Sequence, residues 1–197
     1  IVINSNFWST NKKEFEGKPV FVVSDTLLAL QQTANYYRRK FNIPVLGITG
    51  TNGKTTTKEM IAAALKKSGK VCKTEGNFNN HIGVPLTLFK LTPEDKYAVV
   101  EMGTNHFGEI AALCEIAEPD YGLITNIGHG HTEFLNDIEG VAKAKRELFD
   151  YLKANGGMIF LNTEDIHIAK MSKDFPRSKT FGFSGNENIS AKRMRMN

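Results

Sequence analysis

The sequence is poor in the residues that mark specialised protein classes. Its 197 residues include only two cysteines, Cys72 and Cys114, and neither lies in a C-x-x-C or Cys/His pattern. This spacing excludes a disulfide-rich scaffold and a common zinc site. It is typical of free, buried thiols in a reducing compartment, with a single bridge between the two as the alternative.

Long apolar runs are also absent. The longest covers a handful of residues, whereas roughly 20 are needed to cross a bilayer, so we expect no membrane span. The first 16 residues lack the basic, apolar and small-residue zones of a secretory signal, so we expect a cytoplasmic protein. Because the chain opens on Ile1 rather than methionine, we expect a piece of a longer protein.

Neither sign of charge is in large excess. Lys and Arg number 25 against 21 Asp and Glu, which gives a net charge of +4. The one basic cluster, Lys192, Arg193 and Arg195, is short, and it favours a solvated tail over a nucleic-acid surface. With 41% hydrophobic and 23% charged residues, the composition excludes disorder, collagen and coiled coil. A chain of this size can bury one sizeable core without disulfide or metal.

Apolar runs that alternate with helix-length stretches predict an α/β protein. Such alternation is typical of a mostly parallel sheet with helices on both faces. The expected strands are 45–48, 97–100, 121–124 and 158–161, with later strands at 179–183 and 189–194. The expected helices are 55–68, 84–89, 108–116 and 138–152.

A separate amino-terminal unit is expected before this core. It comprises a strand at 21–23 and an amphipathic helix over 27–41, with Ser24 and Asp25 as candidates for the N-cap. The residue before a proline is pushed out of the helical region, so the helix should end near Pro44. A domain boundary near 42–45 follows.

The segment 47–55 reads G-I-T-G-T-N-G-K-T, the glycine-rich pattern of a P-loop, and it lies between an expected strand and an expected helix. Its glycines would let backbone N–H groups surround phosphate oxygens, while Lys54 reaches the terminal phosphates and Thr55 binds Mg²⁺. The expected ATP-binding residues are Gly50, Thr51, Asn52, Gly53, Lys54, Thr55 and Thr56. A GTPase switch is disfavoured because the N-K-x-D-like segment 11–14 precedes the loop, and the D-x-x-G segment 137–140 follows no apolar strand.

Polar side chains follow two expected strands at the edge where parallel sheets bind ligands. Glu101 follows the strand at 97–100 and is a candidate Mg²⁺ ligand opposite Thr55, or otherwise an exposed acid in a turn. The strand at 121–124 leads into His129 and His131, in a glycine-rich loop. The residues alone do not decide whether one of these imidazoles binds a metal or whether both are solvated.

Lys145 lies in the middle of an apolar helix stripe. The stripe consists of Ile138, Val141, Leu148, Phe149 and Leu152. An ammonium carried inward on this face should have a lowered pKa, which would make the amine reactive. The alternative is a lysine that reaches solvent or pairs with Glu101 or Glu133.

Four segments together resemble the Mur ligases. They are 50–57 (G-T-N-G-K-T-T-T), 75–85 (E-G-N-F-N-N-H-I-G-V-P), 101–110 (E-M-G-T-N-H-F-G-E-I), and 125–149 from T-N-I-G to K-R-E-L-F. The resemblance spans about residues 45–150. Its second and third segments are most similar to the members that join D-alanyl-D-alanine to UDP-N-acetylmuramoyl-tripeptide.

The resemblance implies an ATP-dependent amide ligase of peptidoglycan precursor synthesis, and so of cell wall growth, shape and division. A substrate carboxylate would attack the γ-phosphate, giving an acyl phosphate, and an amine would then displace phosphate. The family also implies a Lys145 carbamylated by CO₂, two Mg²⁺ ions and a monomeric protein without nucleic-acid or membrane partners. The catalytic residues implied are Lys54, Lys145 and His131, and the metal ligands are Thr55, Glu101, His131 and Lys145.

The chain departs from the family pattern in its length. Members of the family have three domains and more than twice as many residues. We therefore expect 1–44 to be a remnant of the first domain or a connecting segment, and 45–197 to be a truncated central ATP-binding domain. The carboxyl-terminal domain would be absent and the piece inactive. The alternatives are a sister Mur or folylpolyglutamate-type ligase, and a non-catalytic P-loop module.

Overall fold

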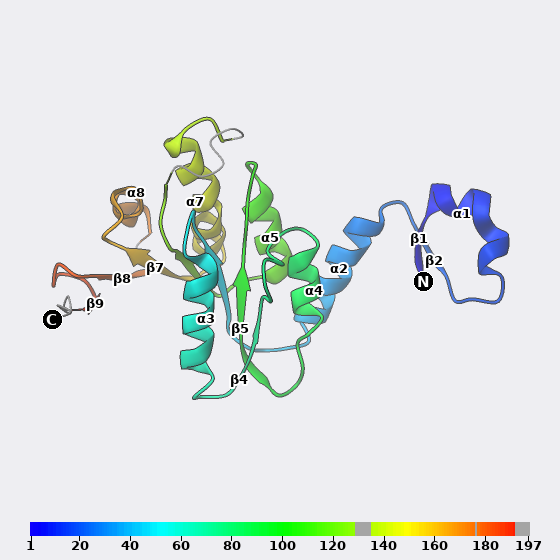
Figure 1. Ribbon diagram of the computed structural model, residues 1–197, viewed down its shortest axis with the longest axis horizontal. Helices are drawn as coiled ribbons and strands as arrows, with labels where there is room; N and C mark the ends of the chain where they lie inside the picture. The colour runs from blue at the N-terminus through cyan, green and yellow to red at the C-terminus, as the bar shows by residue number, and fades with distance from the viewer. Residues whose placement is uncertain (129–134, 176, 192–197) are drawn as a thin grey trace.

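The computed structural model describes residues 1–128, 135–175 and 177–191, and it confirms the expected α/β class. Seven strands form one sheet in the order β4-β5-β3-β6-β7-β8-β9, and the pairings between neighbours are parallel (Figure 1). The strands are β3 Val45–Thr49, β4 Lys70–Lys73, β5 Asp95–Glu101, β6 Tyr121–Ile124, β7 Met158–Asn162, β8 Ser178–Gly182 and β9 Ile189–Ser190. The expected strands are therefore present, but the one expected over 189–194 covers only Ile189–Ser190, and 192–194 lie outside the described residues. Strand β4 is an additional edge strand.

The helices over the described ranges follow the expected periodicity. They are α3 Lys54–Leu65, α4 Gly83–Leu88, α5 Glu109–Ala117, α7 Ile138–Ala154, α8 Ile166–Met171 and the short η2 Ser172–Asp174. Helix α8 was not expected from the sequence because a six-residue segment shows little periodicity. None of the helices in the described ranges is long and apolar enough to cross a membrane.

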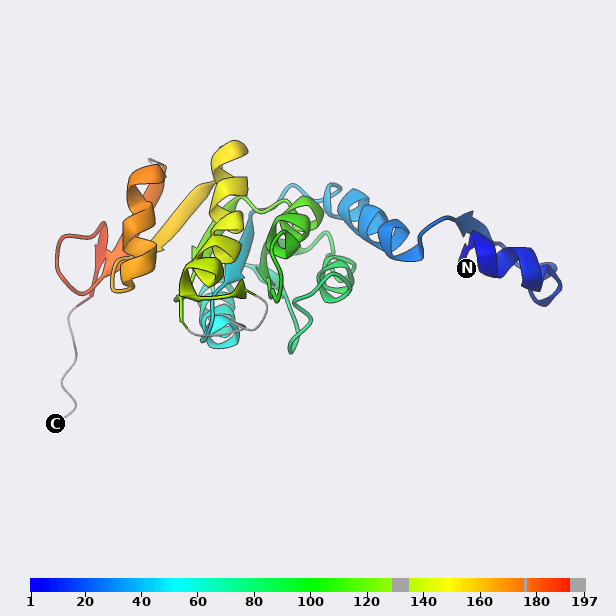
Figure 2. The same cartoon turned by 90° about the horizontal axis from the view of Figure 1, so that it is seen from above.

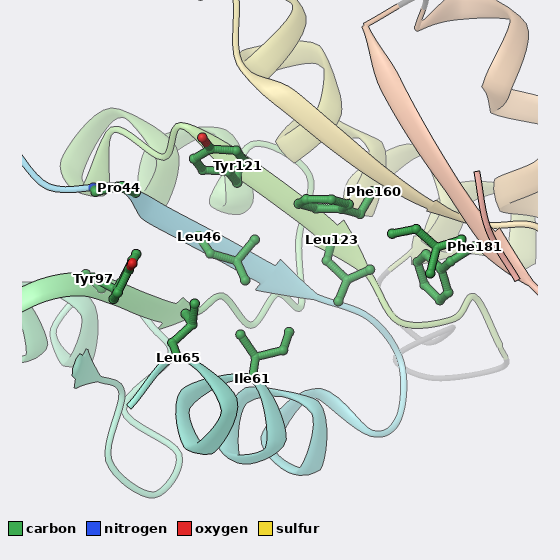
Figure 3. Close-up of a pocket in the computed structure, with 11 residues that line it drawn as sticks. Pro44, Leu46, Ile61, Leu65, Tyr97, Tyr121, Leu123, Phe160 and Phe181 are labelled. Atoms are coloured by element: carbon green, nitrogen blue, oxygen red, sulfur yellow. The ribbon is translucent and has the colours of Figure 1, made fainter. Parts of the chain in front are cut away.

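The two faces of the sheet are covered unequally. Helices α5 and α7 pack on one face, where Leu148 of α7 lies against Gly47 and Gly122 of the central strands. On the other face α3 supplies Ile61 and Leu65 (Figure 3). An apolar cavity of about 530 Å³ lies there, lined further by Leu46, Tyr97, Ala98, Tyr121, Leu123, Phe160, Phe181 and their neighbours. We expected helices to cover both faces of the sheet. Within the described residues they cover one face fully and the other only in part.

The first elements of the amino-terminal unit stand apart from the main body, and α2 joins them to it (Figures 1 and 2). It contains β1 Val2–Asn4, α1 Ser5–Asn11, η1 Lys12–Phe15, β2 Phe21–Val23 and α2 Thr26–Arg38, with β1 and β2 paired in parallel. The expected strand and helix are present, and Asp25 is the N-cap of α2, accepting hydrogen bonds from the backbone N–H groups of Leu27 (2.8 Å) and Leu28 (3.0 Å). The helix ends at Arg38, three residues before the expected end.

Helix α2 is fastened to the end of α5. The buried Arg38 donates from Nε to the carbonyl oxygen of Ala117 (2.9 Å) and from Nη2 to that of Glu118 (3.0 Å). Asn35 donates to the carbonyl oxygens of Glu115 (3.0 Å) and Ile116 (3.1 Å). The last carbonyls of a helix lack partners within it, so α2 completes the hydrogen bonding of α5.

We expect Arg38→Met to destabilise the chain by about 2 kcal/mol, because it leaves buried carbonyl oxygens without a donor. Urea denaturation followed by circular dichroism measures the change. Arg39→Met is the matched control, since Arg39 is exposed and pairs with Glu118 at the surface, and it should leave the denaturation midpoint nearly unchanged. Equal effects of the two substitutions would contradict the fastening role of Arg38.

Candidate functional site

The glycine-rich loop joins β3 to α3. It begins at Gly50, whereas the sequence pattern begins at Gly47. Gly47 lies inside β3, so the loop proper is Gly50 to Gly53. Gly50 has φ +149°, and a Cβ there would lie 1.9 Å from Oγ1 of Thr125. Gly53 precedes α3 with φ +76°, in the left-handed region that favours glycine. Both positions therefore require glycine, the first for close approach and the second for backbone conformation.

The end of β6 holds this loop in shape. The backbone N–H groups of Thr51 and Asn52 donate to Asn126, to its carbonyl oxygen (3.0 Å) and its Oδ1 (3.0 Å) respectively. Thr125 donates from Oγ1 to the carbonyl oxygen of Asn52 at 2.7 Å. The loop is thus preorganised by the neighbouring strand.

Lys54 and Thr55 open α3 directly behind the loop. The Lys54 amine donates to the carbonyl oxygens of Gly50 (2.8 Å) and Thr51 (3.2 Å), so it lies over the loop. Partial burial lowers the pKa of Lys54, and the nearby Glu101 carboxylate opposes that shift. Thr55 donates from Oγ1 to Oε2 of Glu101 at 3.0 Å. The loop lysine and threonine therefore meet the carboxylate at the end of β5.

Glu101 is buried, with only 2% of its surface exposed. Its Oε1 accepts a hydrogen bond from Nδ2 of Asn79 (2.9 Å), and its backbone N–H donates to Oγ1 of the buried Thr74 (2.9 Å). The alternative of an exposed acid in a turn is therefore wrong. Its carboxylate and the Thr55 hydroxyl are hard oxygen donors of the kind that Mg²⁺ prefers.

Lys145 lies on α7 with 2% of its surface exposed. Burial, together with the positive charge of Lys54, lowers the pKa of its amine to about 8. Among the described residues Glu101 pairs with Lys58 and no carboxylate pairs with Lys145, so the alternatives of a salt bridge to Glu101 and of a lysine that reaches solvent are both wrong. Glu133, the other candidate partner, lies outside the described residues, as do His129 and His131.

Lys54 and Lys145 face one polar cavity of about 390 Å³. Its other lining residues come from two loops and from α5, and they are Asn77, Asn79, Asn80, His81, Gly103, Thr104, Asn105, Glu109, Ala112 and Leu113. No group of three or more His, Cys, Asp or Glu residues in the described part of the chain could hold a metal by itself. An ion at Thr55 and Glu101 would take its further ligands from a bound nucleotide, from water or from residues outside the described ranges.

Two residues of the site were not found by sequence reasoning. Asn79 supplies a donor to Glu101, and its asparagine-rich segment was used only for the family resemblance. Lys58 is fully buried, with Nζ 3.6 Å from Oε2 of Glu101. Lys58 follows Lys54 by four residues, and residues i and i+4 of a helix share a face. This spacing could have predicted that Lys58 lies on the same side of α3 as Lys54.

We expect Lys145→Met to stabilise the folded chain by about 3 kcal/mol at pH 7, because the wild type must bury an ammonium whose pKa is about 8. Between pH 8 and about 10.5 the unfolded state retains the proton that the folded state has lost, so wild-type stability rises with pH and the difference shrinks. Urea denaturation of both proteins across pH 7–10.5 measures this. Lys143→Met, an exposed neighbour on α7, is the control and should show no such trend.

Comparison with known proteins relates this chain to one family. The family model "Mur ligase middle domain" matches residues 48–197. The UDP-N-acetylmuramoyl-tripeptide–D-alanyl-D-alanine ligase of Bacillus subtilis (strain 168) is 47% identical over 151 residues, which is 77% of this chain and 33% of that protein. The chain spans about a third of the length of the curated relatives it matches.

Solved structures agree with this relationship. MurF from Acinetobacter baumannii has a TM-score of 0.76 and 36% identity, covering 83% of this chain and 36% of that one. The MurF ligase from Thermotoga maritima, solved in complex with ADP, has a TM-score of 0.79 and 32% identity, covering 86% and 40%. The family match covers most of the chain. The chain therefore belongs to the Mur ligase family, and its residues 48–197 correspond to the middle domain.

Proposed function

We propose that the protein containing this chain is an ATP-dependent amide ligase that joins D-alanyl-D-alanine to UDP-N-acetylmuramoyl-tripeptide. The observation that carries the proposal is the convergence of Lys54, Thr55, Glu101 and Lys145 at the carboxyl edge of β3 and β5. A protein that only binds nucleotide would need the phosphate loop alone. That function gives no reason for a buried amine at Lys145. Relatives named for this reaction supply the choice of substrates.

The loop is suited to the phosphates of ATP. Gly50 and Gly53 allow the backbone to turn around an anion, and the N-terminus of α3 adds its positive dipole end. The Lys54 amine donates hydrogen bonds to two carbonyl oxygens of the loop, so it is close enough to contact a phosphate bound there. The relative from Thermotoga maritima carries ADP, which supports a nucleotide here.

The Thr55 and Glu101 oxygens fit a magnesium ion, because they are adjacent and both are hard donors. Such an ion would neutralise charge on the transferring phosphoryl group. Lys54 contributes to the same end as a fixed cation, since its position is set by the start of α3. The pairing of Thr55 with Glu101 holds both oxygens in place before any ligand arrives.

We propose that Lys145 is carbamylated. CO₂ reacts only with an unprotonated amine, and a pKa of about 8 leaves a usable fraction of that form near neutral pH. The ammonium first loses one proton, and formation of the N–C bond between the neutral amine and CO₂ then releases a second, so that a buried cation becomes an anion. The carbamate, with Glu101 and with His131 beyond the described residues, would then hold a second Mg²⁺.

The polar cavity would receive the carboxylate of the tripeptide substrate next to Lys54 and Lys145. Attack of that carboxylate on the γ-phosphate forms an O–P bond and releases ADP, leaving an acyl phosphate. The amine of D-alanyl-D-alanine then forms the amide and releases phosphate. The asparagine side chains of the cavity wall can donate to the substrate without adding charge.

The relation to longer relatives supports a division of the chain. We propose that 1–44 belongs to a preceding domain or connecting segment and that 45–197 is part of the central domain. Cys72 and Cys114 are both free and buried, in keeping with the proposed cytoplasmic location.

The proposal is tested by phosphate release from the full-length protein. Release should require ATP, UDP-N-acetylmuramoyl-tripeptide and D-alanyl-D-alanine together, and the amide product should be visible by mass spectrometry. Lys54→Ala should lower the rate at least a hundredfold without loss of fold, because phosphate charge is left uncompensated. Release with another amine in place of D-alanyl-D-alanine would favour a sister ligase, and ATP binding without any substrate-dependent release would favour a binding module.

The 197-residue chain alone should bind ADP but form no amide. Its phosphate loop and sheet are present, whereas ligation needs the two substrates held in reacting geometry, which can supply roughly 7–11 kcal/mol of a barrier. Calorimetry measures ADP binding, and mass spectrometry searches for product. Appreciable ligation by the chain alone would contradict the proposed division.

A further inference from the structure

A second lysine of α3 lies inside the site and has no role in the proposed reaction. Lys58 is one helical turn beyond Lys54, and none of its surface is exposed. Its Nζ donates to the carbonyl oxygen of Gly76 at 3.3 Å and lies 3.6 Å from Oε2 of Glu101. Buried ammonium groups are costly unless they are paired, so this placement has to be explained.

The contacts of Lys58 identify Glu101 as its buried partner. Glu59 also approaches, with Oε1 3.5 Å from Nζ, but its side chain is 47% exposed and it also pairs with Lys73. Glu101 is 2% exposed, so its charge is poorly screened by water. The ion pair of Lys58 and Glu101 is therefore the one held in a low dielectric.

The oxygen that faces Lys58 is also the one that faces Thr55. Oε2 of Glu101 accepts from the Thr55 hydroxyl at 3.0 Å, and this pair is the proposed place for the cation. Lys54 adds another positive charge close to the same carboxylate. Without a nucleotide, a divalent cation at Glu101 would meet two ammonium groups and one carboxylate.

We propose that Lys58 is the resident counter-ion of Glu101 and keeps divalent cations off this carboxylate while the site holds no nucleotide. Coulomb repulsion between an ammonium and a dication within a few ångströms is strong where water is excluded. The phosphates of a nucleotide would reverse the balance of charge, so the metal is accepted together with the nucleotide. This inference rests on the proposed metal role of Glu101 and on no particular substrate.

The test measures binding of Mn²⁺, as a probe for Mg²⁺, to the 197-residue chain without nucleotide. Electron paramagnetic resonance of the free ion gives the dissociation constant. Lys58→Met has a similar length without charge, and it should bind Mn²⁺ roughly tenfold or more tightly than the wild type. The gain should vanish in the double variant Lys58→Met/Glu101→Gln. Lys67→Met, an exposed lysine just beyond α3, is the matched control and should bind as the wild type does.

A second variant guards against loss of fold. Lys58→Gln can still donate to the Gly76 carbonyl and should show the same gain, and thermal unfolding checks that each variant is folded. Equal Mn²⁺ binding by wild type and folded variants would overturn the proposal, and so would a gain that survives Glu101→Gln. ADP is added in a final arm, where the wild type should approach the variants in affinity. A chain that binds no ADP would count against the proposed function, whereas the nucleotide-free comparison would still decide the role of Lys58.

Discussion

The Glu101 carboxylate is withdrawn from water at the end of β5, and the surrounding residues are arranged to satisfy it. Asn79 and Thr55 donate hydrogen bonds to its two oxygens, and the Lys58 amine lies beside one of them. Thr74 fixes its backbone. An isolated buried charge would lower the stability of the fold by several kcal/mol. The contacts of Glu101 therefore join β5 to α3 and to the loop that carries Asn79. The site is therefore a product of packing as much as of a loop motif.

Helix α7 serves the site in two ways. It carries Lys145 into the polar cavity, and two residues later Glu147 accepts hydrogen bonds from the backbone N–H groups of Gly108 (2.6 Å) and Ala111 (3.0 Å) at the start of α5. Glu109 in turn holds the backbone of Asn105 (2.6 Å) on the cavity wall. A shift of α7 would thus move the amine and the cavity wall together.

The sequence was sufficient where one property dominates a segment. The runs of β3, β6 and β7 could be placed because each is continuously apolar. The stripe around Lys145 made its burial one of two alternatives, the other being a lysine that reaches solvent or pairs with an acid, and the structure decides for burial. Strand β4 was missed because its residues, K-V-C-K, form an edge strand with only two apolar side chains. Lys58 and Asn79 were missed because their partner, Glu101, is distant in sequence and close only in the fold.

The order of the strands bears on how the chain folds. The central strand β3 pairs with β5 and β6, so each of its neighbours is separated from it by a long stretch of chain. Closing such loops has an entropic cost before any contact compensates for it, and this slows folding. The phosphate loop is held by Thr125 and Asn126, and it can take its shape only after the chain has been synthesised and folded beyond those residues. During synthesis, nucleotide binding at this loop therefore requires that β6 and the two residues after it have been made and have paired with β3.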